Sequence, residues 1–199
     1  MKKVIVYIHG FNSGPGDKSV ELQKQFPDCE IISPQLPYNC DEAMKILREI
    51  VDNNLDNEVY VVATSLGAFY AMMLSVLQAF QDNISFYLIN PSFTPHTTLR
   101  RFVSTTVVNY KTGENFYVSE EFLDKLETYY KALVQTYSPS ALHSCNFFLG
   151  TLDELLDFTN LLDFIRQYKA PYRICYSQQD HRFEDISLVV REIKKNMVY

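Results

Sequence analysis

The sequence lacks any apolar run that approaches the roughly 20 residues needed to cross a bilayer, so we predict no transmembrane helix and no membrane partner. It also lacks the apolar stretch of a secretory signal peptide. The opening MKKVIVYIHG carries two lysines, but its apolar part runs only from Val4 to Ile8 before His9 and Gly10 interrupt it. We therefore expect a first strand here, in a cytoplasmic protein.

Cysteines are few, and their spacing argues against a metal or disulfide framework. Cys29, Cys40, Cys145 and Cys175 include no C-x-x-C pair, so no metal site is predicted. Cys145 and Cys175 lie in apolar runs and are expected to pack as small buried hydrophobic side chains. Basic residues are outnumbered, with 18 Lys and Arg against 24 Asp and Glu and a net charge of −6. This balance argues against a nucleic acid partner, because such proteins usually carry a basic face.

Short apolar runs alternate with amphipathic segments along the chain. Continuously apolar runs are typical of central parallel strands that are covered on both faces. The segments 44–51, 158–165 and 186–197 each place apolar side chains on one helix face, and Pro171 fits the end of the second helix. The alternation predicts an α/β fold with a doubly wound, mostly parallel sheet. The expected strands are Lys3–Ile8, Glu30–Ile32, Glu58–Ala63, Ile84–Ile89, Cys145–Leu149 and Tyr172–Tyr176.

The alternation is interrupted by a long segment, residues 91–144, that has no clear buried strand and is rich in phenylalanine and tyrosine. Ser119, followed by Glu120 and Glu121, predicts the start of a helix within it. We expect residues 1–199 to form one domain, with residues 91–144 inserted over one end of the sheet. The insertion is either a lid on a pocket or a decorated connection.

Ser65 lies in Ala63-Thr64-Ser65-Leu66-Gly67, between an expected strand and an apolar segment with helical spacing. A nucleophile elbow has the form G-x-S-x-G in that context, where small flanking residues let the strand and helix pass closely. Alanine at position 63 departs from the pattern but is still small. The alternative is that Ser65 only caps the helix, so other residues must decide between the two roles.

A nucleophilic serine needs a base, and the base needs an acid that orients it. Of the later histidines, His96 and His143 flank the insertion, whereas His181 follows the last expected strand. Open α/β sheets place their sites in loops at the carboxyl ends of strands, which favours His181 as the base.

The acid is expected in the loop after the preceding strand. Asp153 falls in the turn directly beyond that strand and is favoured, while Asp157, at the start of the next helix, stays an alternative. Asp180 is disfavoured because it is adjacent to His181 and poorly placed to accept a hydrogen bond from its ring. The chain order Ser65, Asp153, His181 is that of α/β-hydrolases.

Two backbone N–H groups are predicted to form an oxyanion hole. One belongs to Leu66, directly after the serine and at the positive end of a helix. The other belongs to Phe11, in the glycine-rich loop of YIHGFNSGPG that follows the first strand. This loop lacks the G-x-x-x-x-G-K-[ST] spacing of a phosphate-binding loop.

Several stretches resemble the YqiA-type esterases, which are small single-domain α/β-hydrolases of bacteria. They are IHGFNSGP, ATSLGAFYA, INPSFTP, YKTGENFYV, LGTLDELLDF and DHRFEDI, and they span nearly the whole chain. Ala63 departs from the family pattern, as do Gln178 and Gln179, which stand where the family often has glycines.

The resemblance implies an α/β-hydrolase fold and hydrolysis of a small-molecule ester or acyl thioester through Ser65, Asp153 and His181. It implies no metal and no organic cofactor. The alternative hypothesis is a catalytically idle α/β-hydrolase fold that binds a ligand or a protein, since fold does not fix function.

Overall fold

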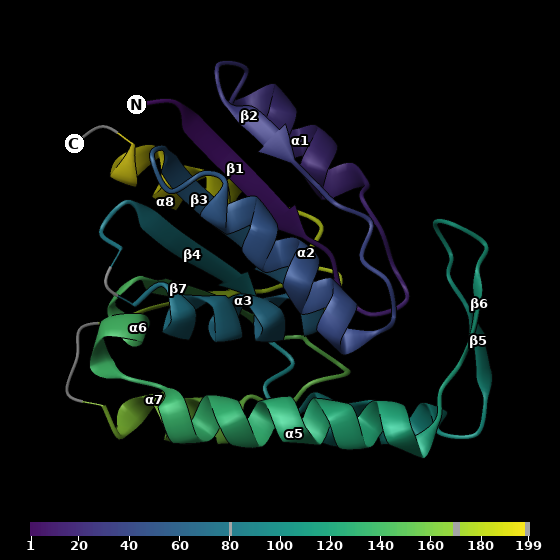
Figure 1. The fold of residues 1–199 in the computed structure, drawn as a ribbon. Coiled ribbons are helices and arrows are strands. Elements are labelled where there is room, and N and C mark those ends of the chain that lie inside the picture. The colour runs from purple at the N-terminus through teal and green to yellow at the C-terminus, as the bar shows by residue number, and fades with distance from the viewer. Residues whose placement is uncertain (80, 169–171, 198–199) are drawn as a thin grey trace.

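The computed structural model describes residues 1–79, 81–168 and 172–197. Within these residues, six strands form one sheet in the order β2-β1-β3-β4-β7-β8, and every neighbouring pair is parallel (Figure 1). The strands are β1 (Lys3–Ile8), β2 (Glu30–Ile32), β3 (Glu58–Thr64), β4 (Ile84–Ile89), β7 (Cys145–Gly150) and β8 (Arg173–Ser177). The strand order reverses between β1 and β3, which is where open α/β sheets form a crevice at the carboxyl ends of their strands.

Both faces of the sheet are covered by helices, as the continuously apolar strands predict. The helices α2, α3 and α7 pack on one face, and α1 and α8 pack on the other. Their bounds are α1 (Asp17–Gln25), α2 (Cys40–Asp52), α3 (Leu66–Leu77), α7 (Thr159–Arg166) and α8 (Ser187–Asn196). The prediction of a doubly wound α/β sheet is confirmed.

The strands divide their side chains between two cores with period two. In β1, Val4, Val6 and Ile8 join the core under α2 and α3, whereas Ile5 and Tyr7 join the core under α1 and α8. The central strands, covered on both faces, therefore have no polar side, whereas the edge strands β2 and β8 are partly exposed. The strand positions expected from the sequence are therefore matched to within one residue at each end.

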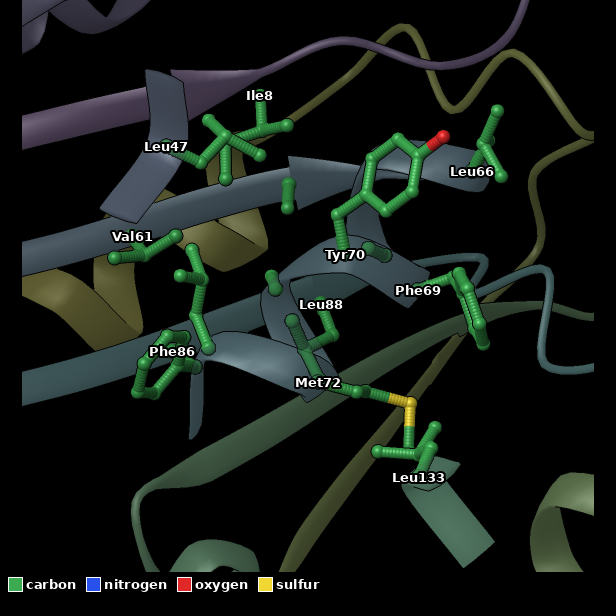
Figure 2. Packing of buried hydrophobic residues seen from close by; sticks show 14 of the residues in the cluster. Ile8, Leu47, Val61, Leu66, Phe69, Tyr70, Met72, Phe86, Leu88 and Leu133 are labelled. Atoms are coloured by element: carbon green, nitrogen blue, oxygen red, sulfur yellow. The ribbon is translucent and has the colours of Figure 1, made fainter. Parts of the chain in front are cut away.

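The insertion forms a second layer outside α3. Its elements are α4 (Pro95–Thr98), the 3₁₀ turn η1 (Arg100–Phe102), β5 (Thr106–Val108), β6 (Asn115–Tyr117), α5 (Glu120–Thr136) and α6 (Pro139–His143). Helix α5 starts where Ser119 Oγ accepts a hydrogen bond from the N–H of Phe122 at 3.2 Å, which confirms the predicted helix start. Met72 of α3 points toward Leu133 of α5 (Figure 2), so α3 is buried on nearly all sides.

The short strands β5 and β6 form an antiparallel hairpin apart from the main sheet, beyond one end of α5 (Figure 1). The two strands are half-exposed or exposed along their length. The hairpin lies at the same side of the molecule as the loops that follow β1 and β2.

A few sequence expectations need adjustment. Cys145 is buried as predicted, but Cys175 is only half-buried because β8 is the last strand at one edge of the sheet. Helix α7 ends at Arg166, and Pro171 lies outside the described residues. Within the described part of the chain, no helix is long and apolar enough to cross a membrane.

Candidate active site

Ser65 occupies a sharp turn between β3 and α3. Its backbone has φ 55° and ψ −119°, a left-handed conformation that non-glycine residues rarely adopt. The Ser65 N–H donates to the carbonyl of Ile89 at 2.9 Å, and the Ser65 carbonyl accepts from the N–H groups of Ala68 and Phe69. Its side chain makes no capping hydrogen bond to α3. The Ser65 hydroxyl therefore does not act as a helix cap, which was the alternative role.

The turn depends on small residues at positions 63 and 67. A Cβ atom on Gly67 would lie 2.4 Å from the carbonyl oxygen of His9 and 2.6 Å from that of Ile8. Glycine is therefore required where the first turn of α3 crosses the end of β1. Ala63 is fully buried in the core under α2 and α3, so its methyl group is accommodated without opening the turn.

His181 and Asp153 complete a hydrogen-bonded chain that begins at Ser65. His181 Nε2 lies 3.1 Å from Ser65 Oγ, and His181 Nδ1 lies 2.8 Å from Asp153 Oδ2. The Asp153 side chain is only 1% exposed and that of His181 is 17% exposed. The imidazole thus presents one nitrogen to the serine while a buried carboxylate holds the other.

The other acidic candidates point elsewhere. Asp157 Oδ1 accepts from the N–H and the hydroxyl of Thr159, so its carboxylate is used at the start of α7. These hydrogen bonds lower the pKa of Asp157. Asp180 Oδ1 accepts from the backbone N–H groups of Arg182 and Phe183, which shapes the loop that carries His181. Of the three carboxylates, the structure brings only Asp153 to the histidine ring.

Asp153 is itself held by the backbone that follows it. Its second oxygen, Oδ1, accepts from the N–H groups of Leu155 and Leu156, each at 2.9 Å. Glu154, the next residue in the same loop, accepts from the backbone N–H of His181 at 3.1 Å. The loop after β7 therefore holds both the Asp153 carboxylate and the backbone of His181.

Two residues that sequence reasoning did not single out connect these loops. Asn90, fully buried at the end of β4, donates from Nδ2 to the carbonyls of Asp180 and His181 and accepts from the N–H of Gly150. A Cβ atom on Gly150 would lie 2.5 Å from the carbonyl of Gln179. The signal was present in the sequence as a polar residue and a glycine at the ends of two neighbouring strands.

The predicted oxyanion donors lie on either side of this site. Leu66 is the first residue of α3, and Phe11 follows Gly10, where an added Cβ would lie 3.1 Å from the Cβ of Ser65. Among the described residues, neither of the two N–H groups donates to a protein acceptor. Their role as oxyanion donors stays a prediction.

His9 anchors the loop that contains Phe11. Its Nε2 accepts from the N–H of Leu36 at 3.0 Å, which leaves the proton on Nδ1, 2.8 Å from the carbonyl of Gly10. Burial lowers the pKa of His9, so the ring is held neutral in this bridging role. The loops after β1 and β2 are thereby tied together next to the serine.

A cleft of about 630 Å³ opens at Ser65 and His181. Apolar side chains of Leu99, Phe102 and Val107 from the insertion line it, together with Leu155 and Leu156 from the loop after β7. Charged side chains also reach it, namely Asp17, Lys18, Arg101, Lys111, Arg182 and Glu184. This volume falls in the range of small-molecule sites.

The remaining histidines lie away from the serine. His96 is in α4 and packs on Tyr130, with ring centroids 4.9 Å apart, and His143 is the last residue of α6. Within residues 1–79, 81–168 and 172–197, no three His, Cys, Asp or Glu side chains gather closely enough to hold a metal ion.

A parallel, doubly wound sheet with a serine at the turn between strand and helix is the architecture of the α/β-hydrolases. Est1E from Butyrivibrio proteoclasticus shares this fold with a TM-score of 0.70 and 15% identity, over 99% of this chain and 87% of Est1E. A monoacylglycerol lipase from Paleococcus ferrophilus does so with a TM-score of 0.70 and 15% identity, over 98% of this chain and 93% of the lipase. Mouse alpha/beta hydrolase domain-containing protein 10 gives a TM-score of 0.68 at 15% identity, over 98% of this chain and 89% of that protein.

The chain belongs to the uncharacterised protein family UPF0227, which matches residues 4–197. This is the YqiA family, so the resemblance stated from the sequence motifs is confirmed.

Proposed function

We propose that the chain is a serine hydrolase that cleaves carboxylic esters or acyl thioesters through an acyl-enzyme on Ser65. The observation that carries the proposal is the continuous chain of hydrogen bonds, 2.8 Å from Asp153 to His181 and 3.1 Å from His181 to Ser65. These distances lie within the range expected of a nucleophile, its base and the acid that orients the base.

The proposed reaction has two halves. His181 Nε2 accepts the Ser65 proton as Oγ attacks the acyl carbonyl carbon, and Asp153 stabilises the resulting imidazolium. The imidazolium then protonates the departing alcohol or thiol, which leaves the acyl group on Ser65. Water attacks the acyl-enzyme with His181 again as base, and the carboxylic acid is released as Ser65 regains its proton.

Negative charge develops on the carbonyl oxygen in both halves. The N–H groups of Phe11 and Leu66 are proposed to donate to it, and the N-terminus of α3 adds a favourable dipole. Because these donors are fixed by the fold before substrate binds, no energy is spent in reorienting them during the reaction. Each such donor typically contributes about 10²–10³ in rate.

The composition of the cleft supports an acyl substrate. Leu99, Phe102 and Val107 provide apolar surface for an acyl chain next to the serine. A monoacylglycerol lipase with the same fold supports ester chemistry by analogy. The aromatic insertion thus contributes a wall of the proposed substrate site.

The test is hydrolysis of 4-nitrophenyl esters from acetate to long acyl chains, and of matching acyl thioesters, together with labelling by a fluorophosphonate probe. We expect wild-type turnover and labelling at Ser65, and a fall of about 10³-fold or more in Ser65→Ala and His181→Ala. Ser140→Ala and His143→Ala serve as matched controls, because both side chains are exposed and remote from the cleft. No turnover on any ester or thioester, with no label at Ser65, would leave the idle binding fold as the better description.

A further inference from the structure

The loop that follows β1 is attached to the tip of the β5–β6 hairpin, almost a hundred residues further along the chain. Asn109 Nδ2 donates to the carbonyl of Ser13 at 2.8 Å, and the Tyr110 hydroxyl donates to Ser13 Oγ at 2.7 Å. In return, Asn12 Nδ2 donates to the carbonyl of Val108 at 2.9 Å. The two residues after Phe11 are thus each hydrogen-bonded to the hairpin.

Both the nitrogen and the oxygen of the Asn109 side-chain amide take part in this contact. The residue is 2% exposed, and its Oδ1 accepts from the N–H groups of Lys111 and Thr112 at 2.9 and 3.1 Å. The oxygen therefore shapes the hairpin tip while the nitrogen reaches across to Ser13. A buried amide with both ends satisfied specifies one geometry, because either bond lost would leave a polar group unpaired.

The Phe11 ring is held by the same insertion. Its centroid lies 6.1 Å from that of Phe102, 6.4 Å from that of Phe116 and 6.0 Å from that of Phe122. Phe116 in turn stacks on Tyr38, with centroids 4.0 Å apart and planes 2° from parallel. Because ring and backbone belong to one residue, packing the ring restricts the direction of the Phe11 N–H.

We propose that the β5–β6 hairpin positions the oxyanion donor of Phe11, and that Asn109 is the positioning residue. This inference rests on the proposed function, in which the Phe11 N–H stabilises the transition state. Asn109 contacts Ser13 and not the reacting atoms, so the hairpin acts on the reaction only through the loop after β1. Lifting this part of the insertion as a lid would break three hydrogen bonds to residues 12 and 13 and release the donor.

Asn109→Asp is the most selective test, since it only replaces the side-chain NH₂ group with an oxygen atom. The aspartate keeps an oxygen for Lys111 and Thr112 but replaces the donor to Ser13 with an acceptor. We expect kcat for a 4-nitrophenyl ester to fall about 10- to 100-fold with little change in KM, because a displaced oxyanion donor weakens only transition-state binding. Asn146→Asp is the matched control: Asn146 also donates to a carbonyl, that of Phe86, but at the start of β7.

Two further measurements separate positioning from stability. Affinity for a trifluoromethyl ketone, which forms an oxyanion on Ser65, is expected to fall in step with kcat/KM, whereas affinity for the product acid is not. Backbone ¹⁵N relaxation of residues 11–13 is expected to give lower order parameters in Asn109→Asp and wild-type order parameters in Asn146→Asp. Relaxation requires no activity, so a wild type without hydrolysis would remove the proposed function while the order parameters still decide whether the hairpin holds the loop.

The inference is overturned if Asn109→Asp keeps wild-type kcat and wild-type order parameters, or if only its thermal midpoint falls. Should Asn109→Asp fail to fold, Asn12→Gly probes the same contact from the loop after β1. Asn12 has φ 55°, which glycine tolerates, so this variant loses the bond to Val108, together with the one accepted from the Tyr38 hydroxyl, without straining the backbone. Wild-type kcat and wild-type order parameters in that variant would equally overturn the inference.

Discussion

The amide of Asn90 holds the backbone of His181: Nδ2 lies 3.3 Å from the His181 carbonyl and 3.1 Å from that of Asp180. The other end of the same amide accepts from the N–H of Gly150 at 2.7 Å. One side chain at the end of β4 therefore sets the histidine loop against the loop that carries the acid. The proposed base and acid are thus positioned by a residue that hydrogen-bonds to neither side chain.

Replacing Asn90 with aspartate is expected to impair this arrangement. Asn90→Asp keeps the acceptor for Gly150 but leaves the carbonyls of Asp180 and His181 without a donor. We expect a loss of about 1–3 kcal/mol in the free energy of unfolding, because buried polar groups become unsatisfied, and a lower kcat. Urea unfolding and ester hydrolysis measure the two effects. Wild-type values in both would show that the loops are held without this amide.

Asp153 and Asp157 were the two candidates for the acid in the sequence, and their substitution is expected to affect kcat very differently. Asp153→Asn removes the acceptor of the His181 Nδ1 proton, so we expect kcat to fall by about 10³- to 10⁴-fold. Asp157→Asn is the matched control, because asparagine serves a helix start about as well as aspartate. Comparable activity in the two variants would contradict the assignment of Asp153.

In Gly67→Ala, a gain in helix propensity is opposed by a steric clash of the added Cβ atom. Alanine would favour α3 by about 1 kcal/mol, but its Cβ would lie 2.4 Å from the His9 carbonyl oxygen. Relieving such a clash with backbone typically costs about 1–3 kcal/mol, so packing is expected to win. We expect a lower free energy of unfolding in urea. A variant as stable as the wild type would mean that α3 can shift away from β1.

The neutral state of His9 makes stability depend on pH. Burial lowers its pKa below 6.5 in the folded chain, so the unfolded chain binds the proton more readily. Stability from this group is complete above pH 6.5 and is lost as pH falls from there to the lowered pKa.

We therefore expect the thermal midpoint of the wild type to drop between pH 7.5 and about 5.5 more steeply than that of His9→Gln, since the lowered pKa of His9 contributes only to the wild type. His96, whose pKa is also lowered chiefly by burial, is present in both proteins and cancels in the comparison. Parallel pH profiles for the two proteins would show that His9 does not contribute.

The strands of the main sheet were predictable because they are covered on both faces. Lys3–Ile8 and Ile84–Ile89 are apolar for that reason apart from Lys3 and Ser85, and their bounds agree with the structure. The loops at the carboxyl ends of all the parallel strands could then be placed along one edge of the sheet, which brought Ser65 and His181 together from sequence alone. The identity of the acid could not be settled this way, because Asp153 and Asp157 differ in side-chain direction and hardly in position along the chain.

The β5–β6 hairpin was not predictable from local pattern. Its strands are three residues each, largely exposed, and are held in place by Ser13 and Asn12 from the far end of the chain. Asn90 could be noticed as a polar residue at the end of a strand, but its three partners lie at the end of β7 and in the loop after β8. Which residues it bonds depends on how distant segments meet, so local pattern does not identify them.

The left-handed backbone of Ser65 also has a consequence for the whole molecule. A non-glycine residue held in such a conformation costs about 1–3 kcal/mol, against a net folding stability of about 5–15 kcal/mol for a typical domain. Glycine at position 65 would relieve that cost while keeping the turn, at the loss of the hydroxyl. A protein that used this cleft only to hold a ligand would therefore gain stability from glycine at position 65. A protein that forms a covalent bond to the serine hydroxyl must instead keep the backbone strain in every folded molecule.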